Sequence, residues 1–224
     1  MGSWFARHRT PTVTALTPTA AYQLWAPSYP PEPHNALMPA EQMAVIGILP
    51  DVVGRTGHDA GCGTGRYTRI LEARGAAAVV GVDLTPEMLV RARGSRALIV
   101  RGDLCALPLA SASVDVAVCG LALNDLADVD RALDELARVL GPGGQLVYSV
   151  VHPRGGALGW SRTFESDEGP RAVLTYWHSC ARLERACAQA QLAIDAVVEP
   201  RLPTGIANPP DGPVALVVRA VKQR

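Results

Sequence analysis

The stretch Asp59-Ala60-Gly61-Cys62-Gly63-Thr64-Gly65-Arg66 decides the fold of this chain. Three glycines alternate behind an acidic residue, and such a turn lets the backbone lie against a ligand that a Cβ atom would hold away. Eighteen residues after Gly65, Asp83 ends the apolar run 76–82. A carboxylate at the tip of the second strand is where a doubly wound sheet holds a ribose. Together these features predict a nucleoside-binding α/β fold.

Predicted strands and helices alternate along most of the chain. The first strand is expected to end at Asp59, and the others are expected at 77–83, 97–100, 114–119, 145–151, 193–198 and 214–221. Helices are expected at 39–49, 65–74, 129–140 and 178–191, with a further one beginning at Pro86. This alternation is typical of parallel strands joined by helical crossovers, so we expect a doubly wound sheet.

The 224 residues fit one domain with additional segments. Residues 1–20 carry Thr and Pro without periodicity, which predicts a flexible N-terminal arm ahead of a single domain over 21–224. Within that domain, the aromatic and proline-containing segment 21–50 is expected to form a lid over the ligand. Residues 153–177 are expected to form an irregular insertion on the substrate side, because long loops without periodicity are more often functional than idle.

Charge and cysteine content exclude several classes of function. The 21 basic residues balance the 21 acidic ones, and a neutral protein has no long-range field for a phosphate backbone, so we expect no nucleic-acid partner. Five cysteines lack CxxC spacing and no cluster has metal-ligand spacing, which favours reduced thiols and no metal. We expect a cytoplasmic protein without a membrane partner, since no signal-peptide or membrane-length apolar pattern occurs. Arg is used almost throughout in place of Lys, which indicates a GC-rich bacterial genome.

The spacing of the glycines separates two kinds of adenosine-containing ligand. Dinucleotide sites use GxGxxG, whose third glycine supports helix packing beside a pyrophosphate. Here Gly61, Gly63 and Gly65 alternate, and no glycine occupies that third position. The alternating turn suits a ligand that has an amino-acid tail and no phosphate.

Later segments continue the pattern in order. Residues 82–89 read VDLTPEML, Gly102-Asp103 follow the third predicted strand, and 113–124 come next in step. From Tyr22 to Pro153 the chain therefore resembles the class I S-adenosylmethionine-dependent methyltransferases, in particular their small-molecule, type 11-like branch. The resemblance implies a Rossmann-like sheet of seven strands with helices on both faces and the last strand antiparallel. It also implies S-adenosylmethionine as the cofactor and S-adenosylhomocysteine as the product.

The same resemblance implies roles for the residues that match its motifs. Asp59 and the turn 61–65 would hold the methionine moiety, and Asp83 would bind both ribose hydroxyls through charge-assisted hydrogen bonds. The remaining contacts would come from Leu84 and Met88 on the adenine, Asp103 and Leu104 at the adenine amine, and the Leu121 backbone at the methionine amino group. Tyr22, Trp25 and Tyr29 would form an aromatic arm that attracts the sulfonium by cation–π contact. Asp103 has a second interpretation, as a turn residue.

The chain departs from the family pattern in two places. The strand before Asp59 usually carries aliphatic residues, but here it reads Arg55-Thr56-Gly57-His58, which weakens the strand and puts an ionisable ring beside the turn. Relatives often carry a histidine near the position of Asn124. Its absence leaves the general base open, and Asn124 itself becomes a candidate substrate contact.

Candidate acceptor-side residues follow the fifth predicted strand. His152 lies at the carboxyl edge of the sheet, where open α/β folds bind substrates, and is either a catalytic base or a loop histidine. Trp160 and Tyr176 either line an apolar acceptor pocket or belong to the core of a cap.

The indicated function is transfer of a methyl group from S-adenosylmethionine to an O, N or C nucleophile of a small molecule. Two alternatives stay open. One is a protein that binds S-adenosylmethionine without transferring its methyl group. The unusual strand before Asp59 and the missing histidine near Asn124 are consistent with this alternative. The other is an NAD-dependent oxidoreductase, which the glycine spacing disfavours. The sequence carries no signal for an oligomeric state.

Overall fold

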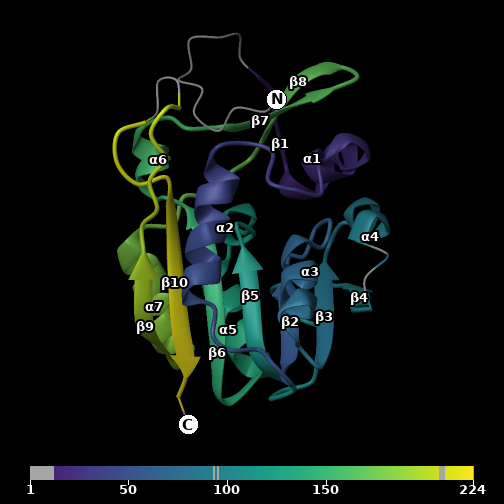
Figure 1. Ribbon diagram of the computed structural model, residues 1–224. Helices are drawn as coiled ribbons and strands as arrows, with labels where there is room; N and C mark the ends of the chain where they lie inside the picture. Colours follow the sequence, from purple (N-terminus) through teal and green to yellow (C-terminus); the bar gives the residue numbers. More distant parts are fainter. Residues whose placement is uncertain (1–12, 93, 95, 207–209, 224) are drawn as a thin grey trace.

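Seven strands form one sheet in the order β4-β3-β2-β5-β6-β10-β9 (Figure 1). This computed structural model describes residues 13–92, 94, 96–206 and 210–223. The strands of the sheet are β2 (Thr56–Ala60), β3 (Ala78–Asp83), β4 (Leu98–Arg101), β5 (Val114–Gly120), β6 (Leu140–Val151), β9 (Leu192–Val198) and β10 (Ala215–Lys222). Strand β10 pairs antiparallel with β6 and β9, while β4, β3, β2, β5 and β6 are mutually parallel. The predicted seven-stranded sheet with an antiparallel last strand is confirmed.

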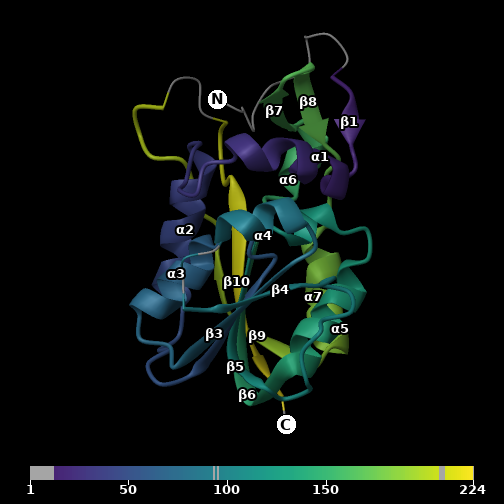
Figure 2. The same cartoon turned by 90° about the vertical axis from the view of Figure 1, so that its right-hand side faces the viewer.

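Helices cover both faces of this sheet. Helices α2 (Leu37–Ile48) and α3 (Arg66–Ala73) lie on one face, and α5 (Val129–Val139) and α7 (Cys180–Gln189) lie on the other (Figures 1 and 2). The short helix α4 (Pro86–Ala92) lies near the carboxyl edge, beside the arm helix α1 (Pro18–Trp25). Helix boundaries fall within three residues of those predicted.

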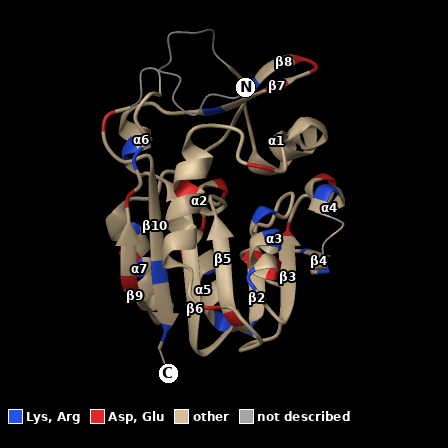
Figure 3. Ribbon diagram, viewed as in Figure 1, with Lys and Arg blue, Asp and Glu red and all other residues tan. Residues whose placement is uncertain are grey.

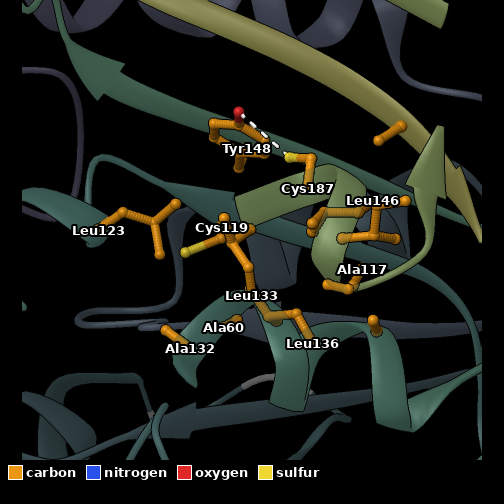
Figure 4. Close-up of a cluster of buried hydrophobic side chains, with 14 of the residues drawn as sticks. Ala60, Ala117, Cys119, Leu123, Ala132, Leu133, Leu136, Leu146, Tyr148 and Cys187 are labelled. Atoms are coloured by element: carbon orange, nitrogen blue, oxygen red, sulfur yellow. Dashed lines mark hydrogen bonds between the residues drawn. The ribbon is translucent and has the colours of Figure 1, made fainter. Parts of the chain in front are cut away.

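The two largest core clusters lie on opposite faces of the sheet because successive side chains of a strand point to opposite faces. Val116 and Val118 face α2 and α3, whereas the alternate residues Ala117 and Cys119 face α5 and α7. Figure 4 shows the second cluster, in which leucines of α5 pack under the sheet and the Tyr148 hydroxyl lies 3.6 Å from the Cys187 sulfur.

Strand β2 forms despite its unusual residues. A Cβ atom on Gly57 would lie 3.2 Å from Leu71 Cδ1, so the glycine allows α3 to pack closely on the strand. His58 is fully buried, and its Nδ1 lies 3.0 Å from the Val80 carbonyl oxygen, to which it donates. Burial lowers the pKa of His58 to about 4, so the ring is neutral at pH 7. The strand therefore accommodates an imidazole where an aliphatic side chain is usual.

The insertion is ordered, contrary to the prediction of an irregular segment. It contains α6 (Arg154–Ala157) and a hairpin of β7 (Arg162–Ser166) and β8 (Gly169–Val173). The hairpin forms because buried and exposed residues alternate along β7 and because Gly169, at φ +96°, permits a tight turn. We call this hairpin, together with the short strand Ala15–Leu16 that pairs with β8, the cap.

The joining strand comes from the N-terminal arm. Strand β1 (Ala15–Leu16) pairs in parallel with β8, and α1 begins at Pro18 after its N-cap Thr17. The part of the predicted arm over 13–20 therefore contains a strand of the cap and the start of α1, and residues 1–12 lie outside the described range.

Basic and acidic residues are interspersed over the sheet, the helices and the cap (Figure 3). In the part of the chain that the structure describes, no helix has the length and apolarity needed to cross a bilayer.

Candidate active site

A pocket opens at the carboxyl edge of the parallel strands, beneath the arm and the cap. Its walls come from the ends of β2, β3 and β5, from α1 and the following 3-10 turn (Ala26–Ser28), from the first turns of α2, α3 and α4, and from β7. The lining residues are Tyr22, Trp25, Tyr29, Pro30, Pro31, His34, Met38, Asp59, Gly61, Cys62, Gly63, Thr64, Arg66, Tyr67, Asp83, Met88, Gly120, Leu121, Ala122, Asp125 and Arg162.

The glycine turn gives the pocket a side-chain-free floor. Gly61 and Gly63 have φ values of +70° and +53°, which residues with a Cβ rarely adopt. A Cβ on Gly61 would lie 2.5 Å from that of Ala122 and would force the walls apart. Gly65, at φ +84°, instead faces Arg69 and Ala92 and serves helix packing. Two of the three glycines thus form a cradle that fits a nucleoside-bearing ligand.

Two carboxylates stand beside this cradle, Asp59 buried and Asp83 partly buried. Asp83 accepts hydrogen bonds from the Gly63 amide at 2.8 Å and the Thr85 amide at 2.9 Å, one on each oxygen. Each oxygen keeps a further lone pair, so Asp83 can still accept from ribose hydroxyls. Asp59 accepts from the Thr68 amide at 2.6 Å and the Thr68 hydroxyl at 2.7 Å, which ties β2 to α3. Burial raises the pKa of Asp59 to about 6 and raises that of Asp83.

The aromatic arm closes the pocket from above. Trp25 stacks on Phe164 of the cap, with ring centroids 4.8 Å apart, and meets Tyr29 edge-on at 4.8 Å. Tyr22 stacks on Trp25 at 6.2 Å. The predicted arm residues Tyr22, Trp25 and Tyr29 therefore meet at the pocket with Asp59, Gly61, Gly63, Asp83, Met88 and Leu121.

Other predicted cofactor residues lie outside the pocket lining. Leu84 is 41% exposed, and Asp103 is exposed and accepts from the Cys105 amide at 2.8 Å, as a turn residue does. Leu104 is buried and lies behind Gly61. Leu104 and Gly65 thus pack behind the pocket wall, whereas Leu84 and Asp103 lie at the surface.

The acceptor-side predictions also lie outside the lining. His152 Nε2 is 3.0 Å from a Glu199 carboxylate oxygen, and Nδ1 accepts from the Arg154 amide at 3.2 Å. Asn124 is buried, where its oxygen accepts from the Val151 amide at 2.7 Å and its amide donates to the Tyr176 carbonyl at 3.1 Å. Trp160 is buried in a cluster between α2 and the strand ends.

Sequence reasoning missed several polar residues that line the pocket or stand behind it. Arg162 of the cap donates to Asp125, which follows β5, and to the Tyr22 hydroxyl at 2.8 Å. Burial raises the pKa of Tyr22 well above its usual range. His34 and Arg66 line the pocket, and Glu41 lies behind Arg66. An acidic residue inside the apolar helix α2 was the available signal for Glu41, since such a residue is buried only with partners.

Known proteins share this fold and this motif. A model of the methyltransferase domain family matches residues 58–148. An uncharacterized methyltransferase of Mycobacterium tuberculosis is 39% identical over 144 residues, which cover 63% of this chain and 53% of that protein. A malonyl-acyl-carrier-protein O-methyltransferase of Pectobacterium atrosepticum is 36% identical over 109 residues, 48% of this chain and 43% of that protein. The chain thus spans about half the length of the curated relatives it matches.

A solved structure extends the likeness over most of the chain. The S-adenosylmethionine-dependent methyltransferase from Mesorhizobium loti superposes with a TM-score of 0.70 at 28% identity, over 82% of this chain and 98% of that one. The strand order, the glycine cradle beside Asp83 and these similarities all point to the same family of proteins. The chain is therefore similar to the class I S-adenosylmethionine-dependent methyltransferases in sequence over residues 58–148 and in fold over most of its length.

Proposed function

We propose that this protein transfers the methyl group of S-adenosylmethionine to an O, N or C nucleophile of a small-molecule acceptor. The observation that carries the proposal is one pocket lined by the glycine cradle, by Asp83 and by the aromatic arm. Gly61 and Gly63 would accommodate the methionine end, Asp83 would bind the ribose, and Met88 would pack on the adenine. When bound, the cofactor supplies an electrophilic methyl group on a sulfonium.

The chain's own contribution is alignment and exclusion of water. Tyr22, Trp25 and Tyr29 cover the cradle, so an acceptor beneath them would be desolvated and held in line with the methyl group. Their ring faces favour a sulfonium over a neutral thioether. Such positioning is the main requirement, because the sulfonium is already a good leaving group.

The acceptor side of the pocket is small and mixed in character. Asp125 and Arg162 neutralise each other there, and apolar surface comes from Met38 and the arm. A neutral, enclosed end suits a small acceptor or the end of a carried acyl group better than a polymer. The relatives named malonyl-acyl-carrier-protein O-methyltransferases support O-methylation as one form of the reaction.

Calorimetry with S-adenosylhomocysteine and with NAD tests the cofactor assignment. We expect S-adenosylhomocysteine to bind and NAD not to. Asp83→Asn should weaken S-adenosylhomocysteine by about tenfold or more, since a charge-assisted bond to the ribose is lost. Asp51→Asn is the matched control, because Asp51 is exposed, accepts from the Val53 amide in a turn and is not among the described lining residues.

Turnover against a panel of phenols, amines and carboxylates tests the transfer itself. A transferase must release S-adenosylhomocysteine together with a product heavier by one methylene unit, which mass spectrometry detects. Binding without release across the panel would favour the non-transferring alternative, and binding of NAD alone would refute the proposal.

A further inference from the structure

One buried carboxylate joins three elements that surround the pocket. Glu41 of α2 is fully buried, and its Oε1 accepts from the Tyr67 hydroxyl at 2.7 Å and the Ser149 hydroxyl at 2.5 Å. Its Oε2 accepts from Arg66 Nη1 at 2.9 Å. A carboxylate is retained in a core only with such partners. Glu41 therefore fixes the start of α3 and the end of β6 relative to the lid helix.

Arg66 is held directly beside the glycine cradle. It is the first residue of α3, it lines the pocket, and its side chain is only 10% exposed. Nη1 donates to Glu41 and to Gln42 at 3.2 Å, and the guanidinium carbon lies 4.3 Å above the Tyr67 ring. These contacts with described residues run through Nη1, and a guanidinium has five N–H donors. The remaining donors suit an anionic ligand group.

The same network reaches the backbone at the end of β5. The Ser149 hydroxyl that donates to Glu41 also accepts from the Leu121 amide at 2.9 Å. Leu121 lines the pocket in a left-handed conformation, at φ +61°. The orientation of this pocket-lining peptide thus depends on the same buried carboxylate as that of Arg66.

Charge balance assigns a partner to the guanidinium. S-adenosylmethionine ends in an α-carboxylate, and the cradle that would receive this end lies between the carboxylates Asp59 and Asp83. The two arginines among the described lining residues each have a carboxylate partner, Glu41 for Arg66 and Asp125 for Arg162, and Arg66 is the one that follows the glycine turn directly in the chain. A guanidinium matches a carboxylate in charge and in geometry, which an ammonium or an amide does not.

We propose that Arg66 binds the α-carboxylate of the cofactor's amino-acid end and that Glu41 is the positioning residue that holds Arg66 for it. This inference rests on the proposed function. It makes the Glu41–Arg66 pair the part of the site that distinguishes a complete cofactor from a tail-less adenosine thioether.

Two ligands that differ only at the tail test the assignment. S-adenosylhomocysteine carries the amino-acid end, and 5′-deoxy-5′-methylthioadenosine keeps the adenosine and the sulfur without it. In calorimetry, Arg66→Met should weaken S-adenosylhomocysteine by about tenfold to a hundredfold, the range for a charge-assisted contact. The affinity for methylthioadenosine should change by about twofold at most. Glu41→Gln should also weaken the binding of S-adenosylhomocysteine but not that of methylthioadenosine, by a smaller factor than Arg66→Met.

Arg69→Met is the matched control. Arg69 lies on the same helix, donates to the Thr64 and Pro31 carbonyls and is not among the described lining residues. We expect it to leave the ratio of the two affinities unchanged. Arg66→Lys, which keeps the charge but loses the planar fork, should show an intermediate ratio and keeps the test usable if Arg66→Met folds poorly.

The outcomes separate this inference from the proposed function. If the wild type binds S-adenosylhomocysteine but Arg66→Met and Arg66→Lys weaken both ligands equally or neither, the inference is wrong and the proposed function stands. If the wild type binds neither ligand, the proposed function fails and this inference fails with it.

Discussion

His34 is the lining residue best suited to accept a proton from an acceptor. Its ring meets Tyr29 edge-on at 4.9 Å and Trp25 at 5.7 Å, and Nδ1 lies 3.4 Å from the Glu32 carbonyl. With Nδ1 donating to that carbonyl, Nε2 carries a lone pair. Burial lowers the pKa of His34 below 6.5, so the ring is neutral and basic at pH 7. His152, by contrast, is engaged with Glu199 outside the described lining.

His34→Asn should therefore lower kcat for a phenolic acceptor by about a hundredfold, the lower range for general-base catalysis. The affinity of this variant for S-adenosylhomocysteine should be unchanged. In the wild type, kcat/KM should fall as pH drops below 6.5, because protonated His34 accepts no proton, and the variant should lack this fall. His152→Asn is the comparison: if it removes the acid limb and His34→Asn does not, the assignment returns to His152.

At the scale of single residues, the pocket lining shows which residues a sequence motif can and cannot bring to notice. Gly61 and Gly63 were predicted from a short local motif and Asp83 from the end of the next apolar run, and all three line the pocket. The contacts of Glu41 were not predicted, because Ser149 lies 108 positions further along the chain. Arg162 and Asp125 likewise meet only through the cap, across 37 positions. Local spacing reveals a turn, but only the tertiary fold brings such charges together.

At the scale of elements, strand β2 holds two neighbouring groups whose proton affinities shift in opposite directions. Burial lowers the pKa of His58 from 6.5 to about 4, so between these values the unfolded chain binds more protons and stability falls as pH falls. Burial raises the pKa of Asp59 from 3.8 to about 6, so there the folded chain binds more protons and stability rises as pH falls. The two contributions oppose each other between pH 6 and 4.

Removing one of the two groups should reveal the pH dependence of stability that the other contributes. In His58→Gln, the free energy of unfolding should rise as pH falls from 6 to 4, by about 3 kcal/mol for a shift of about two pKa units. In Asp59→Asn it should fall by a similar amount over the same interval. Urea titrations at closely spaced pH values measure these slopes, relative to the wild type. If the unfolding free energy changed with pH in the same way in both variants, the pKa shifts assigned to His58 and Asp59 would be wrong.

The regular elements were predictable because their apolar residues follow one period. Helix α5 buries Leu133, Leu136 and Ala137 on one side and ends at Val139, one residue before the predicted end. The β7–β8 hairpin was missed because its strands are five residues long and half of each faces solvent. Its stability depends on the arm strand β1, which lies far away in the sequence.

A largely buried ion pair joins the cap to the turn that follows β5. The side chains of Arg162 and Asp125 are 2% and 14% exposed. Arg162→Met leaves the Asp125 carboxylate without its cation, and we expect a loss of about 3–5 kcal/mol in urea unfolding. Arg162→Met with Asp125→Leu should recover part of this loss. Arg171→Met in the same hairpin is the control, because its partner Glu168 is 76% exposed and such pairs contribute under about 1 kcal/mol. Equal losses in the two single variants would contradict the assignment.

At the scale of the whole molecule, the pocket has a floor and a roof of different construction. The floor is the carboxyl edge of a seven-stranded sheet with two large core clusters behind it. The roof combines the arm with the cap and is supported by a small cluster of Ala21, Trp25, Phe164 and Val173. Fewer buried contacts mean a lower free energy of local opening, so the roof should open while the sheet stays closed.

Hydrogen exchange with and without S-adenosylhomocysteine tests this division. In the free protein, amides of α1 and of β7–β8 should exchange much faster than those of β5 and β6, because local opening requires no disruption of the sheet. Ligand at about a hundredfold excess over Kd adds about 2.7 kcal/mol to every opening that releases it. Roof amides should then slow by up to about a hundredfold, since the arm and the cap cannot open while the ligand is held beneath them. The edge strand β9 supplies the internal control, because local fraying there leaves the pocket intact and should keep its rate. If the roof were as protected as β5 before ligand is added, or stayed fast at saturation, the arm and the cap would not be the gate to the pocket.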